Sequence, residues 1–181
     1  MSLKDKNIIL GITGSIAAYK ACDIIRGLIK ESAFVECILT KNAAEFITPL
    51  TIETLSKNRV HTKMFDKHKS WEIEHISLAQ KANLILIAPA SADIIARLAS
   101  GRADDLLCST VLASKAQIIV CPAMNTNMYN HKATQNNMEI LKSFGYKIIS
   151  AEKGELACGQ IGDGRLASID KIISEVKKCL I

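Results

Sequence analysis

Two polar segments of this chain combine residue types that suit chemistry on a small acid. The first, Pro122-Ala123-Met124-Asn125, is a proline-led turn with a carboxamide side chain, which can hold a small anion at the end of a strand. The second, Ala157-Cys158-Gly159, places a cysteine between small residues, as in a reactive loop that can move. Together the two segments indicate chemistry on a small sulfur-bearing acid.

The composition limits the classes of protein to which the chain can belong. With 181 residues, 49% of them hydrophobic, the chain is predicted to form one globular domain spanning 1–181. No signal peptide is recognised, so we expect a reducing, cytoplasmic setting. The six cysteines show no C-x-x-C pair, and we expect no bound metal ion. The apolar runs are too short to span a membrane. A net charge of +5 with 4% aromatic residues argues against nucleic-acid binding and fits anionic small molecules.

Two hydrophobic periodicities alternate along the chain and predict its fold. Short apolar runs predict strands at residues 7–12, 34–39, 84–88, 118–121 and 146–149. Helical spacing predicts helices at residues 16–30, 42–46, 49–55, 76–80, 94–98, 106–113, 138–144 and 172–180. This alternation predicts an α/β fold, a three-layer, doubly wound parallel sheet with ligands at the carboxyl ends of its strands.

A turn with two glycines follows the first predicted strand. Gly11, Gly14 and Ser15 let the backbone approach a phosphate, whose charge is favoured by the N–H groups at the start of the next helix. A plain strand-to-helix turn explains the same residues, because the pattern falls short of G-x-G-x-x-G. Thr40, after the second strand, can contact the same phosphate or cap the helix that follows it. The residues alone leave both interpretations open.

Small residues follow the predicted strand of residues 84–88. Ala90, Ser91 and Ala92 leave room for a planar ligand to lie against the backbone. Asp93 adds a polar side chain to this loop, although it is equally suited to cap the helix predicted at residues 94–98. The loop is therefore a candidate binding site for a ring.

Five motifs, taken in order along the chain, resemble those of the homo-oligomeric flavin-containing cysteine decarboxylase family. They lie at residues 11–20, 88–93, 101–110, 121–125 with Met128, and 157–159. The resemblance runs from about residue 6 to residue 168, and the ordered set is far more specific than any single motif. Three positions depart from it, since Asp93, Tyr129 and Gln160 stand where many relatives have Asn, Trp and Asp. None of these departures removes a reactive group.

The resemblance implies a cofactor and an assembly. It implies a flavodoxin-like, three-layer fold that assembles as homotrimers or higher orders of trimers, with FMN bound near the interface between subunits. The cofactor-binding residues that it implies are Gly14, Ser15, Ile16, Thr40, Ala90, Ser91, Ala92, Asp93 and Ala123. Their types are suitable, because glycine permits close approach, hydroxyls satisfy phosphate oxygens and small side chains leave room for the flavin ring.

The resemblance also implies a reaction, the decarboxylation of 4′-phosphopantothenoylcysteine to 4′-phosphopantetheine in coenzyme A biosynthesis, through thioaldehyde and enethiolate intermediates. Oxidation of the thiol end supplies the electron sink that an ordinary cysteine carboxylate lacks. By the same resemblance, His75 takes a proton in the oxidative step, Asn125 holds the substrate carboxylate and Cys158 protonates the enethiolate. Met128 lies on the loop over the substrate, and Arg165 either anchors a closed flap or contacts the substrate phosphate.

The segment of residues 154–164 has four glycines in eleven residues and no apolar periodicity. We therefore predict a mobile flap that closes over the substrate, excludes water and carries Cys158 to the reacting atoms. On the other side, the uncharged amide of Asn125 can orient a carboxylate without strongly stabilising the charge that leaves as carbon dioxide.

Two other functions are compatible with much of the same pattern. One is a peptidyl-cysteine decarboxylase that modifies the C-terminus of a peptide antibiotic precursor by the same flavin chemistry. The other is a regulatory subunit of a protein phosphatase, which the presence of His75, Asn125 and Cys158 makes the weaker alternative. A flavin prenyltransferase shares the fold, but the loop of residues 122–125 argues against it.

Overall fold

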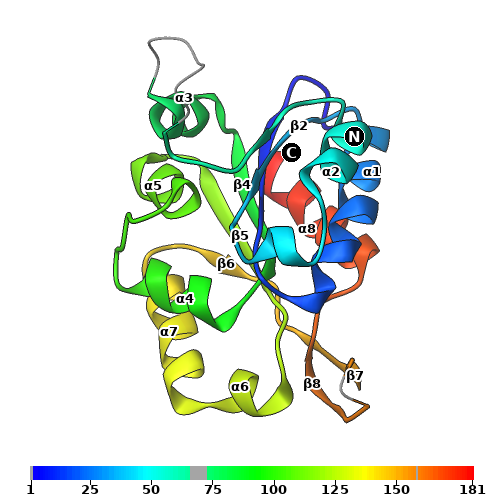
Figure 1. The fold of residues 1–181 in the computed structure, drawn as a ribbon, viewed down its shortest axis with the longest axis vertical. Helices are drawn as coiled ribbons and strands as arrows, with labels where there is room; N and C mark the ends of the chain where they lie inside the picture. The colour runs from blue at the N-terminus through cyan, green and yellow to red at the C-terminus, as the bar shows by residue number, and fades with distance from the viewer. Residues whose placement is uncertain (1, 66–72, 158) are drawn as a thin grey trace.

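A six-stranded parallel sheet forms the centre of the computed structural model, which describes residues 2–65, 73–157 and 159–181 (Figure 1). In spatial order its strands are β3 (Val60–His61), β2 (Phe34–Leu39), β1 (Asn7–Ile12), β4 (Leu84–Ala90), β5 (Gln117–Pro122) and β6 (Lys147–Ile148). The chain moves outward from β1 in one direction and from β4 in the other. Ligands in such sheets bind at this switch point, outside the carboxyl ends of β1 and β4.

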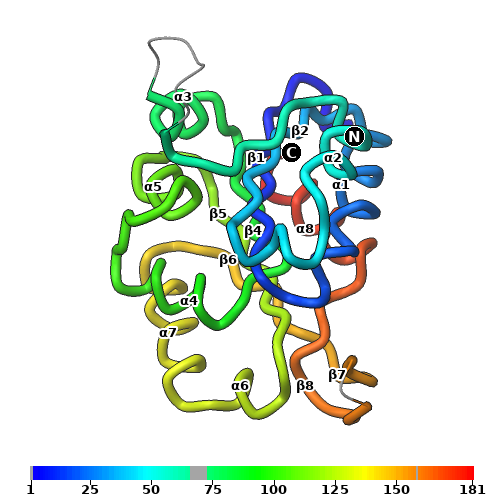
Figure 2. Tube along the Cα trace, viewed as in Figure 1, coloured from blue at the N-terminus to red at the C-terminus, as the bar shows by residue number. Residues whose placement is uncertain are grey.

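Helices cover both faces of the sheet, as the tube in Figure 2 shows. One face carries the 3-10 helices η1 (Ile16–Lys20) and η2 (Ala43–Glu45) with α1 (Ala21–Lys30), α2 (Pro49–Ser56) and α8 (Ile169–Leu180). The other face carries α3 (Glu74–Lys81), α4 (Ala92–Ala99), α5 (Leu106–Ala113) and α7 (Lys132–Ser143). The predicted three-layer α/β fold is confirmed. Without the two-residue β3, the strand order is that of flavodoxin.

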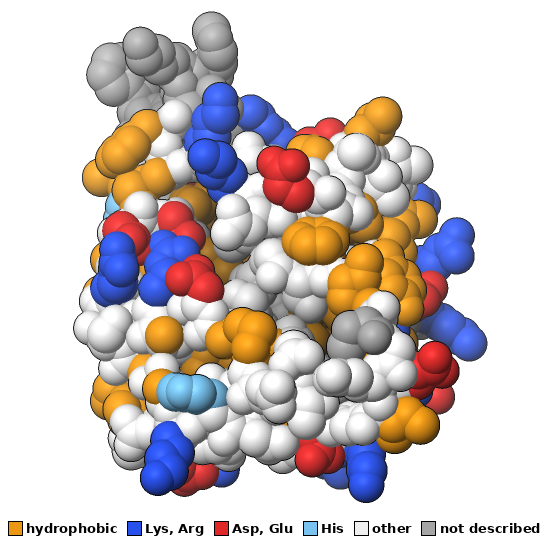
Figure 3. Space-filling model, turned by 60° about the horizontal axis from the view of Figure 1, so that its bottom comes forward, with side chains coloured by type: hydrophobic (Ala, Val, Ile, Leu, Met, Phe, Trp, Pro, Cys, Tyr) orange, Lys and Arg blue, Asp and Glu red, His pale blue; other side chains and the backbone are white. Residues whose placement is uncertain are grey.

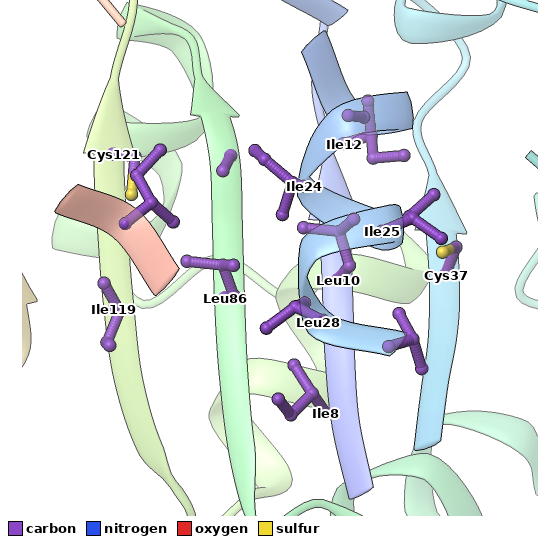
Figure 4. Close-up of a cluster of buried hydrophobic side chains, with 14 of the residues drawn as sticks. Ile8, Leu10, Ile12, Ile24, Ile25, Leu28, Cys37, Leu86, Ile119 and Cys121 are labelled. Carbon is purple, nitrogen blue, oxygen red and sulfur yellow. The ribbon is translucent and has the colours of Figure 1, made fainter. Parts of the chain in front are cut away.

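Alternate residues of each strand enter opposite cores, because side chains of a strand point to its two faces in turn. Leu10 of β1 belongs to the core beneath α1, whereas its neighbour Ile9 belongs to the core on the opposite face. Figure 4 shows Ile24, Ile25 and Leu28 of α1 over the strands on the first side. Both faces of the sheet are therefore buried beneath helices, as the apolar strand sequences predict.

The cysteines behave mostly as small hydrophobic residues. All five described cysteines are free thiols, and Cys37, Cys108 and Cys121 are buried. Burial raises the pKa of the thiols of Cys37 and Cys121 and raises that of Cys108 to about 12. These three thiols are therefore protonated and unreactive at neutral pH.

The glycine-rich segment predicted to form a mobile flap contains regular secondary structure that the sequence analysis did not predict. It folds as an antiparallel hairpin of β7 (Glu152–Glu155) and β8 (Ile161–Arg165). The sequence gives no alternation of apolar residues here because the hairpin packs through its glycines. A Cβ atom at Gly162 would overlap the side chain of Thr126, and one at Gly164 would overlap the carbonyl oxygen of Met124.

The parts of the chain that the structure describes contain neither a candidate membrane span nor a candidate metal cluster. No helix there combines the length and apolar character that crossing a membrane requires. No group of three or more His, Cys, Asp or Glu side chains there is arranged to hold a metal ion.

Candidate active site

Two cavities lie at the carboxyl ends of the strands, and Gly14 and Ser91 border both. The larger has a volume of about 630 Å³ and is enclosed by the loops after β1, β4 and β5 together with the β7–β8 hairpin. The smaller has a volume of about 150 Å³ and a mostly polar lining. Figure 3 shows this end of the molecule, with a hollow bordered by hydrophobic side chains and with charged side chains clustered to one side.

The larger cavity brings together most of the residues predicted from the sequence. Those that line it are Gly14, Ser15, Ile16, Ser91, Ala92, Ala123, Asn125, Met128 and Arg165. Thr40 and Asp93 line the smaller cavity. Ala90 lines neither, since it is fully buried behind the wall, where its carbonyl accepts a hydrogen bond of 3.0 Å from the N–H of Ala123. Ala90 therefore helps to position the wall.

The turn after β1 combines a position restricted to glycine with backbone N–H groups at the start of η1. A Cβ atom at Gly14 would lie 2.6 Å from Cβ of Asn42, so only glycine fits there. The Ser15 side chain caps η1 by accepting from the N–H of Ala17 at 3.3 Å. The first backbone bond of this helix runs from Ala18 to the Ser15 carbonyl, so the N–H groups of Ser15 and Ile16 precede the helical bonding. Such N–H groups suit the phosphate of a flavin nucleotide.

Thr13 joins the loops after β1 and β4, and the sequence analysis did not identify it. Its hydroxyl donates to the carbonyl of Pro89 at 2.7 Å and accepts from the N–H of Ser91 at 2.9 Å. The residue is buried. In the sequence, Thr13 is recognisable only as a hydroxyl residue next to the apolar run of β1. Its role could not be predicted from there, because its hydrogen-bond partners lie 76 and 78 residues away in the chain.

Asn125 immediately precedes α6 (Thr126–Asn130) as its N-cap residue and lines the larger cavity. Its amide oxygen accepts a hydrogen bond of 2.8 Å from the N–H of Asn127 and so caps the helix. The amide nitrogen is then the group of this side chain that can donate to a carboxylate. Capping thus uses the amide oxygen of Asn125, and the binding role considered for this residue would use its amide nitrogen. Met128, half-exposed on the same helix, borders the cavity beside it.

The hairpin is fastened at its base to the loop that carries Asn125. The N–H of Met124 donates to the carbonyl of Gly164 at 2.9 Å, and the Thr126 hydroxyl donates to the carbonyl of Asp163 at 2.8 Å. Ala157 and Arg165 of this region line the larger cavity. Cys158, the predicted proton donor, lies outside the described residues.

The smaller cavity is bordered by a network of charges around Arg97, a second residue that the sequence analysis did not identify. Its guanidinium lies 2.8 Å from Asp105 and 3.7 Å from Asp93, and it also contacts Asp104. Burial opposes the charge of Arg97, but its hydrogen bond to Asp104 and its interaction with Asp105 raise its pKa. Asp105 in addition caps α5 by accepting from the N–H of Cys108 at 2.8 Å. Asp93 thus has an ion-pair role as well as a position in the cavity lining.

His75 is not brought together with the other predicted catalytic residues. It lies in the first turn of α3, and it lines neither cavity. Figure 1 places α3 at the opposite end of the molecule from α6 and the hairpin. Its Nδ1 atom is buried and has no hydrogen-bond partner among the described residues. Within one chain, His75 therefore does not reach the cavity that contains Asn125.

Known proteins resemble this chain in sequence over nearly its whole length. It is 44% identical over 177 residues to a probable phosphopantothenoylcysteine decarboxylase of Streptococcus mutans, covering 97% of this chain and 99% of that protein. It is 41% identical over 176 residues to the coenzyme A biosynthesis bifunctional protein CoaBC of Bacillus subtilis. That match covers 97% of this chain and 43% of CoaBC, so the chain spans less than half the length of the bifunctional protein.

Solved structures and a family model agree with this likeness. A cysteine-to-serine mutant of PPC decarboxylase, complexed with pantothenoylaminoethenethiol, superposes with a TM-score of 0.85 at 28% identity, covering 96% of this chain and 97% of that one. The FMN-dependent cysteine decarboxylase SpaF gives a TM-score of 0.83 at 26% identity, covering 99% and 100%. The family model described as Flavoprotein matches residues 1–181. The chain therefore belongs to the flavoprotein family.

Proposed function

We propose that this chain is an FMN-dependent decarboxylase that converts 4′-phosphopantothenoylcysteine to 4′-phosphopantetheine and carbon dioxide in coenzyme A biosynthesis. The observation that carries the proposal is the larger cavity, where the turn at Gly14, the amide of Asn125 and the glycine hairpin meet at the switch point of the sheet. The Streptococcus mutans relative, which has nearly the same length, supports the choice of substrate.

The described residues suit FMN. The N–H groups of Ser15 and Ile16 would hold its phosphate, with Thr40 nearby, and the small side chains of Ala92 and Ala123 leave space for its ring. When bound, FMN would supply the oxidation of the substrate thiol and the later return of hydride.

The chain itself would orient the substrate and move its protons. Asn125 would donate a hydrogen bond to the carboxylate through its uncharged amide. A cationic side chain at this position would stabilise the substrate carboxylate more than the transition state for loss of carbon dioxide, and so would slow the reaction. Met128 and the hairpin would exclude water from the reacting atoms. Cys158 would deliver the proton that completes the product.

The wider setting forms part of the same proposal. Residues 1–181 would act as a single domain, in the cytoplasm, within a homotrimer or a higher order of trimers. The described free thiols suit a reducing compartment. Exposed apolar side chains on and beside α3 and α5, namely Phe65, Ile73, Ile76 and Leu112, suit a subunit interface. The distance of His75 from its own cavity is consistent with a role in the cavity of a neighbouring subunit.

The decisive experiment uses the purified protein and two substrates. We expect a flavin absorption spectrum, directly or after reconstitution with FMN. We also expect release of carbon dioxide and 4′-phosphopantetheine from 4′-phosphopantothenoylcysteine, and little release from a peptide with a C-terminal cysteine. A protein that takes up no FMN, or one that decarboxylates only the peptide, would contradict the proposal.

Two variants separate the proposed roles within the reaction. Asn125→Asp places a negative charge against the substrate carboxylate, so turnover should stop before carbon dioxide is released. Cys158→Ser should still release carbon dioxide and accumulate an oxidised enethiol product. If Cys158→Ser gives the normal product at an undiminished rate, Cys158 is not the proton donor.

A further inference from the structure

Two basic side chains line the larger cavity. Lys20 is the last residue of η1 and is half-buried, whereas Arg165 ends β8 on the hairpin and is exposed. Both belong to the cavity lining. Within the described parts of the chain, neither side chain forms an ion pair. The cavity therefore has an excess of positive charge in one part of its wall.

The two cations lie near enough to affect each other. Burial lowers the pKa of Lys20, and the charge of Arg165 lowers it further, whereas the carboxylate of Glu152 acts in the opposite direction. Glu152 is placed opposite Arg165 in the hairpin register, but one of its oxygens accepts from the N–H of Ser168 at 3.0 Å. An anion that enters between Lys20 and Arg165 would relieve their repulsion, which is the electrostatic property of an anion-binding subsite.

The two charged side chains that the hairpin contributes to the cavity lining have opposite signs and lie at different distances from its base. Arg165 lies at the base, and Glu155, which also lines the cavity, lies three residues nearer the tip than Glu152. At about 3.3 Å per residue these positions are separated by roughly 10 Å. A long substrate with two anionic ends would therefore meet the strongest attraction at the base of the hairpin, beside Lys20.

The proposed substrate has such ends, a carboxylate and a terminal phosphate. Two cations on the carboxylate would stabilise a charge that must disappear as carbon dioxide leaves, and so would oppose the reaction. The phosphate keeps its charge throughout, so strong binding there carries no such penalty. A guanidinium can also hold two phosphate oxygens at once, with a lysine as an additional point charge.

We propose that Lys20 and Arg165 form the subsite for the terminal phosphate of the substrate and so select phosphorylated over unphosphorylated acids. This inference rests on the proposed function, and it assigns to Arg165 the substrate contact and not the anchoring of a flap. It also separates the two phosphates at the site, because the flavin phosphate is assigned to the N–H groups of Ser15 and Ile16.

The test compares two substrates on FMN-loaded protein, 4′-phosphopantothenoylcysteine and the same compound without its phosphate. Lys20→Met and Arg165→Met should each raise KM for the phosphorylated substrate by about tenfold to a hundredfold, since each removes a charged hydrogen-bonding partner. KM for the unphosphorylated substrate and kcat for both should change little. Lys153→Met is the matched control, because it removes the same charge from the same hairpin at an exposed position outside the cavity lining.

Three results would overturn the subsite. An equal rise in KM for both substrates would show that the two cations do not bind the phosphate. A fall in kcat without a change in KM would place them at the carboxylate. Weaker FMN binding by Lys20→Met or Arg165→Met, measured by titration of flavin fluorescence, would assign them to the flavin phosphate.

A binding measurement keeps this inference distinct from the proposed activity. If the unmodified protein decarboxylates neither substrate, the proposed function fails. Calorimetric titration of the FMN-loaded protein with 4′-phosphopantothenate and with pantothenate still tests the subsite, because it needs no turnover. We expect tighter binding of the phosphorylated acid, and loss of that preference in both variants. Equal affinity of the unmodified protein for the two acids would contradict the subsite.

Discussion

The hydroxyl of Thr126 donates a hydrogen bond of 2.8 Å to the backbone carbonyl of Asp163. This contact joins the first residue of α6 to the strand β8, immediately beside Asn125 in the sequence. A backbone bond from Met124 to Gly164 lies next to it. The base of the hairpin is therefore held at a fixed position relative to the amide that is proposed to orient the substrate.

Replacement of Thr126 tests this connection. Thr126→Val removes the donor and keeps the shape of the side chain, so the free energy of unfolding should fall by about 1 kcal/mol. Amide hydrogen exchange in β8 should also become faster, because a bond at the base of the hairpin is lost. Thr126→Ser keeps the donor and should resemble the unmodified protein. Equal exchange rates in the two variants would show that the hydroxyl does not hold the hairpin.

Gly164 should tolerate no side chain. It has a φ of +119°, and an added Cβ would overlap the carbonyl oxygen of Met124. Gly164→Ala should therefore cost about 2 kcal/mol or more of stability and displace the hairpin. Gly145→Ala is the control, because its φ is +86° but nothing lies within 4 Å of the added atom. Thermal unfolding should show the larger loss for Gly164→Ala, and equal losses would indicate backbone strain without a collision.

Loss of the Thr13 hydroxyl should affect both loops at the switch point. Thr13→Val leaves the N–H of Ser91 and the carbonyl of Pro89 without their partner, which should cost about 1–3 kcal/mol. FMN affinity should fall as well, because both loops border the proposed flavin site. Thr13→Ser should retain most of both properties. Unchanged flavin affinity in Thr13→Val, measured by fluorescence titration, would count against this role.

The pair of Glu36 and His61 predicts a pH dependence of stability. Interaction with His61, whose Nε2 lies 3.6 Å from Oε1, lowers the pKa of Glu36 below its ordinary value of 4.5, against the effect of burial. A carboxyl with a lowered folded-state pKa stabilises the fold above its unfolded pKa, and this contribution is lost as the pH falls through the folded one. The advantage of the unmodified protein over Glu36→Gln should therefore decline below pH 4.5.

Urea unfolding at about pH 5.5 and about pH 3.5 measures this change. Glu139→Gln is the control, since its carboxylate forms an exposed surface pair with Lys142. Exposed pairs of this kind contribute little to stability. An advantage over Glu36→Gln that stays constant between the two pH values would contradict the prediction.

Elements with strong local signals were predicted to the residue. β1, β2 and α5 have the bounds expected from the sequence, because each is a mostly apolar segment bordered by a turn or a capping residue. Asp105 supplies such a cap for α5. By contrast, β3 has only two residues, and the hairpin depends on contacts with α6. Neither has a pattern of its own that would reveal it.

The same distinction applies to the candidate site. The small residues and Asn125 could be identified because their types are unusual at the ends of strands. Thr13 and Arg97 could not, since their roles depend on partners that only the folded chain brings near. The position of His75 relative to the cavity likewise depends on how α3 packs. Residue types predict which groups are available for chemistry, and tertiary packing decides which of them meet.

The wall shared by the two cavities has a consequence for affinity. Gly14 and Ser91 border both cavities, so the two spaces are adjacent, and an elongated ligand that entered both would have one end in each. Once one end is bound, the other end is held near its own space at a high effective concentration. Two separate fragments would lack this advantage and would bind far more weakly than the joined molecule. The two adjacent cavities would thus favour a long ligand over its separate halves.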